Sequence, residues 1–409
     1  MNDFSYVEKL LDGVEVVWFP ISEVTERTTN IKWRETSESH QYIDLTSVSV
    51  DTKKIIETTE VKASNAPSRA QKLVKKDDVL FATTRPTQMR YCLIDEEYDG
   101  AVASTGYCVL RVKRDVTLPK WILHLISSSD FKKYLEENQS GSAYPAISDA
   151  KVKHFSIPIP CPDNPEKSLA IQAEIVRILD AFTAMTAELT AELNMRKKQY
   201  NYYRDQLLSF DLSAEQAGEG EVEWKTLGDI AEIGTGKHDT RDAIEDGEYI
   251  FYARGREPLK LNTFNFDETA IITAGDGAGV GKVYHYAQGK YALHQRAYRI
   301  VPDDSMHPRF VYHYISAYFY DYIQKASVSS SVTSLRRPMF LKFPIPVPPH
   351  SEQSRIVEIL EKFETLTTSI QEGLPREIEL RQKQYEYYRD LLLSFPACPA
   401  GGPKSEEAA

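Results

Sequence analysis

The residues most suggestive of chemistry lie in a glycine-rich stretch, AGDGAGVGKV at Ala274–Val283. A P-loop has the form G-x-x-x-x-G-K-[ST], so that its backbone N–H groups surround phosphate oxygens. Here Gly275 and Gly281 lie six positions apart, one more than this motif allows, Asp276 stands where its first glycine belongs, and Val283 replaces its hydroxyl residue. The following VYHYAQGKYAL favours strand and turn, whereas a dinucleotide site requires a helix there. The sequence therefore predicts a tight turn and no nucleotide site.

No other residues have the spacing of a catalytic or metal site. GTGK at 234–237 fails as a phosphate loop for the same reasons, and no Asn-Pro-Pro or Asp-Pro-Pro precedes an aromatic residue, as it does in amino-methyltransferases. His238 and Asp239 adjoin, but neither has a partner spaced for metal binding or nucleophile activation. The cysteines lack CxxC spacing and a neighbouring histidine pair, which predicts ordinary thiols; they are Cys92, Cys108, Cys161 and Cys398. These patterns predict a chain without an active site or bound metal.

Clusters of basic residues indicate binding. Residues 62–90 hold seven of them against two acids, Asp77 and Asp78; the seven are Lys62, Arg69, Lys72, Lys75, Lys76, Arg85 and Arg90. A second set falls in predicted loops and strand ends and comprises Lys237, His238, Arg241, Arg254, Arg256, Lys282, Arg296, Arg336 and Arg337. The whole chain nevertheless has a net charge of −11. Because tight phosphate-driven binding needs clustered cations, we expect a partner protein to supply more basic surface.

The chain consists of two similar halves. KKQYNYYRDQLLSF at Lys197–Phe210 returns as QKQYEYYRDLLLSF at Gln382–Phe395. IPIPCP and EIVRIL precede the first copy, FPIPVP and RIVEIL precede the second, and the openings EVVWFPISEV and EVEWKTLGDI also correspond. The period of roughly 200 residues exceeds the 20 to 50 of a solenoid repeat. Each half is therefore predicted to form a domain with its own core.

Two helical segments must position these domains. Pro165–Phe210 lacks internal Pro and Gly, and its apolar residues recur at gaps of three and four, which predicts a rod of roughly 65 Å. The second segment, which ends at Phe395, has the same spacing of apolar residues from Ile356 onward, but Gly373, Leu374 and Pro375 predict a kink in it. Two such stripes most economically bury each other as an antiparallel coiled-coil pair. The alternative is two unrelated amphipathic helices, each packed on its own domain.

The segments before the helices mix β-rich runs with short helices, which predicts an α+β fold for both. Asp211–Glu223 holds five acids and no base and is predicted to be a linker. The predicted divisions are a first domain at 1–155, a spacer helix at 156–210, the linker and second domain at 211–342, a second spacer helix at 343–396 and a disordered tail at 397–409. The N-terminus lacks a signal pattern, and no apolar run approaches a membrane span, so we expect a cytoplasmic protein.

The repeated segments resemble the specificity subunits of type I restriction–modification enzymes, and in detail their IC subfamily. The resemblance covers residues 1 to about 396 and is strongest at Ser156–Phe210 and Phe343–Phe395. Gln139–Phe155 and Val328–Phe343 are similar to the closing segment of a target recognition domain in that family. Only the two variable segments depart from a fixed pattern, as is expected where members of a family recognise different bases.

This resemblance implies a non-catalytic, cofactor-free subunit with two target recognition domains, held apart by an antiparallel helical spacer. Each domain would recognise one half of a split, asymmetric site in double-stranded DNA. Two methyltransferase subunits would dock on the chain and use S-adenosylmethionine to methylate adenine N6, and motor-nuclease subunits that use ATP and Mg²⁺ would join them. Repeated aromatic and leucine residues are expected in the spacer and subunit interface; they are Tyr200, Tyr203, Leu207, Tyr385, Tyr388 and Leu392.

Side-chain chemistry suggests which residues contact bases, because Arg pairs bidentately with guanine and Gln with adenine. The expected DNA contacts are Arg85, Gln88 and Arg90 in the first domain and Lys237, Arg254, Arg256 and Arg296 in the second. The bases themselves depend on docked geometry and do not follow from sequence. Two rival classes are a free-standing DNA-modifying enzyme, which the missing motifs oppose, and a coiled-coil adaptor that binds no nucleic acid.

The first spacer helix contains a tandem repeat, TAEL at Thr186–Leu189 and again at Thr190–Leu193. Four helical residues add about 6 Å and about 400°, which is one turn plus roughly 40°. A unit can therefore be added while its leucine stays near the packed face. The sequence predicts that this helix sets an adjustable distance, although a run of good helix formers would also explain the repeat.

Overall fold

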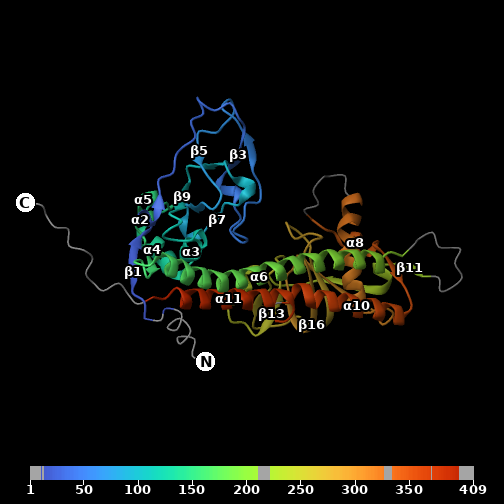
Figure 1. Ribbon diagram of the computed structural model, residues 1–409. Helices are drawn as coiled ribbons and strands as arrows, with labels where there is room; N and C mark the ends of the chain where they lie inside the picture. Colours follow the sequence, from blue (N-terminus) through green and yellow to red (C-terminus); the bar gives the residue numbers. More distant parts are fainter. Residues whose placement is uncertain (1–10, 12, 211–221, 327–333, 370, 396–409) are drawn as a thin grey trace, which may run out of the picture. The chain divides into compact units, whose positions relative to one another are not determined.

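The computed structural model describes residues 11, 13–210, 222–326, 334–369 and 371–395 (Figure 1). The chain forms two compact units: unit 1 comprises residues 1–190 and 377–409, and unit 2 comprises residues 191–376. The predicted tail and nearly all of the predicted linker lie outside the described residues. Within the described part, no helix is both long and apolar enough to cross a bilayer.

Unit 1 contains a strand pair and two four-stranded sheets. In the pair, β1 (Val16–Pro20) runs antiparallel to β10 (Ser156–Pro160). The first sheet has the order β2 (Thr25–Glu26), β9 (Tyr107–Val112), β6 (Val79–Ala82) and β7 (Tyr91–Leu93). The second has the order β4 (Thr59–Val61), β3 (His40–Ile43), β8 (Val102–Ser104) and β5 (Ala70–Leu73). Short helices accompany them, namely α2 (Ile21–Val24), α3 (Pro119–Leu125), α4 (Ser129–Asn138) and α5 (Asp149–His154).

The core of unit 1 joins the first sheet to these helices. All four residues of β6 are buried, and Phe81 meets Phe131 of α4 edge to face at 5.2 Å between ring centroids. Trp121 of α3 is fully buried, and its Nε1 donates a hydrogen bond to the carbonyl of Pro158 at 3.1 Å. The strand pair, α3 and the sheet thus share one core.

Unit 2 repeats this plan with a larger sheet. β11 (Glu223–Thr226) pairs with β18 (Pro344–Val347) in an antiparallel pair. The six-stranded sheet has the order β12 (Ala231–Thr235), β17 (Ala297–Pro302), β15 (Phe266–Ala274), β16 (Tyr284–Leu293), β13 (Tyr249–Tyr252) and β14 (Leu259–Leu261). Its helices are α7 (Leu227–Ile230), α8 (Pro308–Ala326), α9 (Arg337–Leu341) and α10 (His350–Thr368). Phe319 of α8 stacks on Phe340 of α9 at 4.7 Å, which anchors α8 in the core.

Two buried glutamines show the repeat at atomic detail. Gln172 and Gln353 occupy equivalent positions before EIVRIL and RIVEIL, and both are fully buried. Gln172 Oε1 accepts the N–H of Leu118, and its Nε2 donates to the carbonyl of Val116, both at 3.0 Å. Gln353 Oε1 accepts the N–H of His307 at 2.7 Å. Each glutamine therefore satisfies backbone groups just before α3 or α8, groups that are costly to bury without a partner.

The first spacer helix is confirmed as one element, whereas the second is not. α6 (Pro165–Leu207) runs for 43 residues without interruption. The second segment consists of two helices of 19 residues, α10 and α11 (Leu374–Leu392). Gly373 adopts a φ of +86°, and a Cβ there would lie 2.5 Å from the carbonyl oxygen of Thr365. The interruption predicted at Gly373 is therefore confirmed, whereas a second long helix is not, because α10 ends at Thr368 and α11 begins at Leu374.

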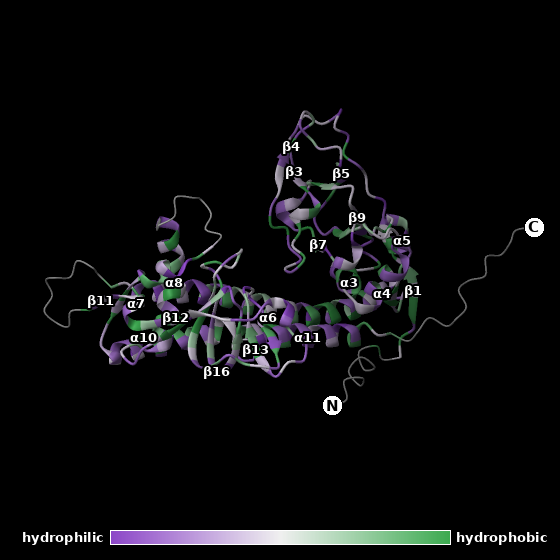
Figure 2. Ribbon diagram, turned by 180° about the vertical axis from the view of Figure 1, so that it is seen from behind, coloured by the Kyte–Doolittle hydropathy of each residue, from purple (hydrophilic) through white to green (hydrophobic). Residues whose placement is uncertain are grey.

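α6 packs against α11 in unit 1 and against α10 in unit 2. Phe182 of α6 stacks on Tyr388 of α11 at 5.3 Å, and Tyr203 of α6 stacks on Phe363 of α10 at 5.6 Å. Contacts thus run in opposite order along α6 and the C-terminal helices, as in an antiparallel pair. Both views show α6 and α11 side by side, and Figure 2 shows hydrophilic and hydrophobic residues along both helices, as expected when only one face is packed.

Candidate nucleic-acid interface

In unit 1, Arg85 and Gln88 lie on the exposed turn between β6 and β7. Arg85 has a φ of +48°, and its N–H donates to the carbonyl of Pro145 at 2.7 Å. Its guanidinium lies 5.9 Å from the ring centre of Tyr144, whose side chain is 74% exposed. The structure therefore brings two candidate residues beside an exposed aromatic ring that the sequence analysis did not single out.

Arg90 is placed differently from its two neighbours. It is half-buried, and its Nη1 donates to the carbonyl of Leu45 at 2.8 Å and to that of Val48. Lys53 lies next to it, with Nζ 4.7 Å from the ring centre of Tyr91, and burial lowers the pKa of Lys53 to about 8. Arg90 thus uses two of its donors to fasten the turn to the segment after β3.

In unit 2, Asp276 brings two candidate arginines together. Arg254 Nη1 donates to Asp276 Oδ1 at 2.9 Å, and Arg296 Nη1 donates to Asp276 Oδ2 at 2.8 Å. The three residues come from the ends of three different segments, after β13, after β15 and before β17. The arginine side chains are 40% and 64% exposed. The fold therefore brings to one carboxylate two arginines that lie 22 and 20 residues from it in sequence.

Lys237 and Gln295 border this cluster. The N–H of Lys237 donates to the carbonyl of Leu293 at 3.1 Å, and the Lys237 side chain is exposed. Gln295 is also exposed, and its Nε2 donates to Asp239 at 3.2 Å. Arg256 is exposed on the turn that follows Arg254. All four second-domain candidates thus lie near strand ends, and Gln295 is a further candidate because a glutamine amide can pair with adenine.

The charges of this cluster are stabilised locally. Burial alone would raise the pKa of Asp276, but hydrogen bonds from Arg254 and Arg296 outweigh it and lower that pKa. Burial, together with the charge of Arg254, lowers the pKa of His294. Neutral His294 accepts the N–H of Arg296 at its Nδ1, at 2.9 Å. At neutral pH the site therefore presents two cations held by one anion.

The exposed turn of unit 1 and the glycine-rich segment of unit 2 occupy equivalent positions. Each follows the third strand in its sheet order, β6 or β15. Thr84 forms an isolated bridge with Ala146, and Asp276 forms one with Ser334. The glycine-rich segment is indeed a turn, between β15 and β16, as the sequence predicted. It occupies, moreover, the position at which unit 1 carries Arg85.

The six spacer candidates mostly face the interior of the chain itself. Tyr385 lies with its hydroxyl 3.0 Å from His124 Nδ1, and Leu392 is 4% exposed. Tyr388 and Tyr203 form the stacked pairs described above, and Tyr200 and Leu207 pack against the core of unit 2. These residues therefore hold the helices to their own units.

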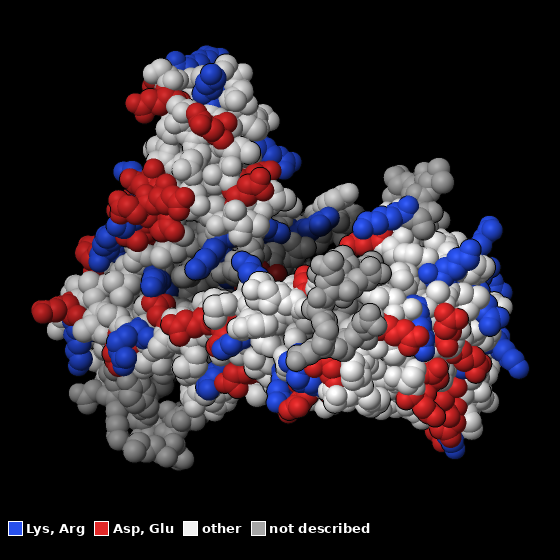
Figure 3. All heavy atoms as spheres, turned by 90° about the vertical axis from the view of Figure 1, so that its right-hand side faces the viewer, with Lys and Arg blue, Asp and Glu red and all other residues white. Residues whose placement is uncertain are grey.

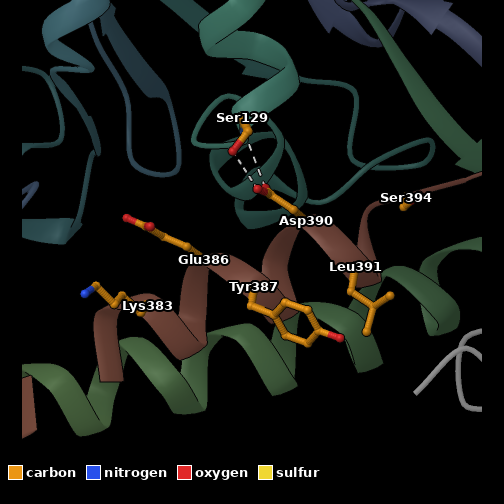
Figure 4. Close-up of a pocket in the computed structure, with 7 residues that line it drawn as sticks. All are labelled: Ser129, Lys383, Glu386, Tyr387, Asp390, Leu391 and Ser394. Atoms are coloured by element: carbon orange, nitrogen blue, oxygen red, sulfur yellow. Dashed lines mark hydrogen bonds between the residues drawn. The ribbon is translucent and has the colours of Figure 1, made fainter. Parts of the chain in front are cut away.

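The outward-facing tyrosines of the repeat are Tyr202 and Tyr387, 58% and 57% exposed. Tyr387 lines an open pocket of about 430 Å³ on α11, shown in Figure 4. The other lining residues are Ser129, Lys383, Glu386, Asp390, Leu391 and Ser394. In this view the Ser129 hydroxyl donates to Asp390, which ties α4 to α11 at 2.5 Å. Sequence places both tyrosines in three-tyrosine clusters that one helical partner cannot bury, but it does not show which member of each cluster faces outward.

On the face shown in Figure 3, basic and acidic side chains are interspersed, and acidic ones form the denser groups. Within the described ranges, no group of three or more His, Cys, Asp or Glu side chains could hold a metal ion. The exposed Arg, Lys and Gln side chains at strand ends stay candidates for contact with nucleic acid.

Residues 15–196 and 219–380 each match the family model described as the type I restriction modification DNA specificity domain. The chain belongs to the family of type I restriction enzyme specificity subunits. It is 41% identical to the Escherichia coli EcoR124I/EcoR124II specificity subunit, over 97% of this chain and 98% of that one. It is 33% identical to the Escherichia coli EcoprrI specificity subunit, over 91% and 93% respectively.

Solved structures agree with this specificity-subunit fold. One is a chain from work titled "Structural basis underlying complex assembly and conformational transition of the type I R-M system", with a TM-score of 0.61 at 21% identity, covering 92% of this chain and 97% of that one. Another is the type I restriction-modification system S subunit from M. genitalium, with a TM-score of 0.56 at 15% identity, covering 95% and 98%. At these identities the likeness concerns the fold alone.

Proposed function

We propose that this chain is the non-catalytic sequence-specificity subunit of a type I restriction–modification complex and recognises a split, asymmetric site in double-stranded DNA, one half-site per domain. The supporting observation is the duplication itself. Two DNA specificity domains lie in one chain, and each carries exposed Arg and Gln side chains near strand ends, Arg85 and Gln88 in unit 1 and Arg296 and Gln295 in unit 2. Such side chains discriminate base edges in the major groove.

The same proposal includes the partners of the chain. Two methyltransferase subunits dock on it, use S-adenosylmethionine and methylate adenine N6, and motor-nuclease subunits join with ATP and Mg²⁺, all in the cytoplasm. The repeated, outward-facing Tyr202 and Tyr387 support two equivalent docking sites, because exposed aromatic residues are enriched in protein interfaces. The net charge of −11 supports a partner that contributes basic surface. Alone, the chain is expected to bind DNA weakly or aggregate.

The test is reconstitution with the methyltransferase subunits of the host, followed by single-molecule sequencing of methylated adenines. The expected result is one split motif with a constant gap. A gel-shift of the same complex separates the adaptor alternative, which predicts no duplex binding. Incubating the chain alone with S-adenosylmethionine and DNA separates the enzyme alternative, which predicts methyl transfer without a partner. Specific, salt-resistant nanomolar binding by the isolated chain would contradict the proposal.

A further inference from the structure

We propose that the glycine-rich segment Ala274–Val283 is the positioning element of a two-arginine recognition site, in which Asp276 holds Arg254 and Arg296 for contact with guanine edges of the second half-site. This inference rests on the proposed function. It gives a role to a motif that resembles a phosphate loop without having its spacing.

The cluster is built on the single carboxylate of Asp276. One carboxylate uses each of its oxygens for one guanidinium, and each arginine bonds it through Nη1. A guanidinium has five N–H donors, so both arginines keep donors for a base. Arg254 and Arg296 are 40% and 64% exposed, whereas Asp276 is 20% exposed. The carboxylate therefore lies behind the arginines and fixes them from the protein side, which lowers the entropy lost when they bind.

The glycines explain how the segment approaches both arginines. A Cβ on Gly275 would lie 2.6 Å from the carbonyl oxygen of Arg296, and a Cβ on Gly279 would lie 2.6 Å from that of Arg254. Real side chains essentially never come that close. The N–H of Gly275 donates to the carbonyl of Arg296 at 2.8 Å. The glycines thus let one loop touch the backbone of both arginine-bearing segments while Asp276 bonds their side chains.

Two histidines hold the same segments, His285 from β16 and His294 from a position two residues before Arg296. His285 Nε2 lies 3.1 Å from the carbonyl oxygen of Gly255 and holds the turn after Arg254. His294 Nδ1 accepts the N–H of Arg296. Both arginines are therefore fixed at backbone and side chain, an arrangement that suits directional pairing with a base better than a general attraction to phosphate.

The position of the segment links it to recognition. It follows β15 as the Arg85 turn follows β6, and each forms an isolated bridge to the segment that closes its domain. In unit 1 the turn itself carries the arginine, whereas in unit 2 the turn carries the carboxylate that holds two. The two domains thus place guanidinium groups at equivalent sites by different local sequences.

The experiment uses the complex with its methyltransferase subunits and measures binding to a library of duplexes with either half-site randomised. Asp276→Asn keeps the size of the side chain and removes its charge. We expect it to reduce discrimination at the affected base pairs of the second half-site about tenfold or more, with the first half-site unchanged. Arg296→Lys, which keeps the charge but loses the planar fork, should have the same effect. Glu232→Gln, which breaks an ion pair with Arg299 in the same unit, is the control and should change neither half-site.

The results for the variants test the two-arginine site, and the result for the wild-type complex tests the proposed function. The inference is overturned if Asp276→Asn and Arg296→Lys both keep full discrimination, or if binding weakens equally for every sequence, since that would assign the arginines to phosphates. Arg296 is largely exposed, so its variant stays informative if Asp276→Asn does not fold. If the wild-type complex selects no split site, the proposed function itself fails, and the inference fails with it.

Discussion

At the scale of single residues, two equivalent histidines have opposite environments. His124 and His313 occupy the same position in PKWILHLIS and PRFVYHYIS. His124 bonds at both ring nitrogens, with Tyr385 at 3.0 Å and Asp180 at 3.1 Å. His313 is 1% exposed, and neither of its ring nitrogens has a hydrogen-bond partner among the described residues. A buried polar group without a partner weakens a fold, whereas a paired one supports it.

We therefore expect opposite effects from the same substitution. His124→Leu should lower the free energy of unfolding by about 1 to 3 kcal/mol, because Tyr385 and Asp180 lose a partner. His313→Leu should leave stability unchanged or raise it, because it removes an unpaired group of similar size. Urea denaturation of the two variants measures the difference. Equal destabilisation by both substitutions would contradict this account.

His313 also predicts a pH dependence. Burial, with the charges of Arg309, Arg204 and His307, lowers the pKa of His313 to about 3. The folded-state pKa of His313 lies below the unfolded value of 6.5. The unfolded chain therefore binds this proton first, so the free energy of unfolding is fully retained above pH 6.5 and falls as the pH drops toward 3. The loss approaches about 1.4 kcal/mol per pH unit. The thermal stability of the wild type should fall between pH 6.5 and 4, and His313→Leu should reduce the slope of stability against pH. Equal slopes in the two proteins would exclude the histidine as the cause.

Arg85 and Arg90 separate recognition from stability within one turn. Arg85→Ala should change the preferred first half-site of the complex. The guanidinium of Arg85 is exposed beside the ring of Tyr144 and can contact a base. Arg90→Ala should lower the free energy of unfolding by about 2 kcal/mol, since it leaves the half-buried carbonyls of Leu45 and Val48 without their charged donor. Methylation mapping and urea denaturation of both variants test the pair. If Arg85→Ala kept both affinity and half-site, Arg85 would be a surface or phosphate contact.

Sequence indicated Arg85, Gln88 and Arg90 alike as DNA contacts and could not show that Arg90 is hydrogen-bonded within the fold. Its acceptors lie 42 and 45 residues away, and nothing local indicates that they meet. Asp276 escaped prediction for the same reason, since its partners lie 22 and 20 residues away in other segments. Residue types and turns are local properties, whereas partners depend on sheet order.

At the scale of elements, the helices were more predictable than the sheets. An unbroken run without Pro or Gly predicted α6 within a few residues of its end, and the Gly-Leu-Pro sequence located the interruption between α10 and α11. The sheets mix antiparallel neighbours with parallel pairs such as β3–β8 and β13–β16. Such pairings join strands far apart in sequence, so alternation of side chains along one strand does not reveal them.

The outer faces of α6 and α11 carry a testable prediction. Tyr202→Ala and Tyr387→Ala should each weaken the docking of one methyltransferase subunit, and the double variant should weaken both, because the two residues are equivalent in the repeat and more than half exposed. Native mass spectrometry of the reconstituted complex counts the subunits. Ile250→Ala, at a residue 48% exposed on β13, is the control. Full occupancy in the double variant would place the docking surface elsewhere.

At the scale of the whole molecule, the compact units do not coincide with the sequence repeats. Unit 1 includes residues from 377 onward, which belong to the second repeat, and unit 2 includes the end of α6, which belongs to the first. Trp121 meets Phe395 at 5.8 Å in unit 1, and Phe310 meets Phe210 at 6.1 Å in unit 2. The C-terminal end of each repeat thus packs in the core of the unit that holds the other repeat's domain. Sequence could not show this exchange, because two similar helices fit either core.

The boundary between the two units falls within α6, and the TAEL tandem spans that boundary. The boundary between the units falls at Thr190, and α6 is continuous across it. Thr186 and Thr190 each donate a side-chain hydrogen bond to the carbonyl four residues earlier, at 3.0 and 2.8 Å. The two copies of TAEL therefore have the same local structure. A third copy can continue this helical structure without entering either core.

Insertion of one more TAEL after Leu193 should lengthen the gap between the half-sites and leave their bases unchanged. The insert adds about 6 Å and about 40° beyond a full turn, and B-DNA rises about 3.4 Å per base pair, so the gap should grow by one or two pairs. The insert makes α6 longer without lengthening α10 or α11. The break between α10 and α11 can absorb this difference in length, since these are two separate helices. A two-residue insert at the same place is the control: it turns the following face by about 200° and should abolish assembly. Mapping of methylated adenines measures the gap; an unchanged gap, or altered half-site bases, would show that the length of α6 does not set the distance.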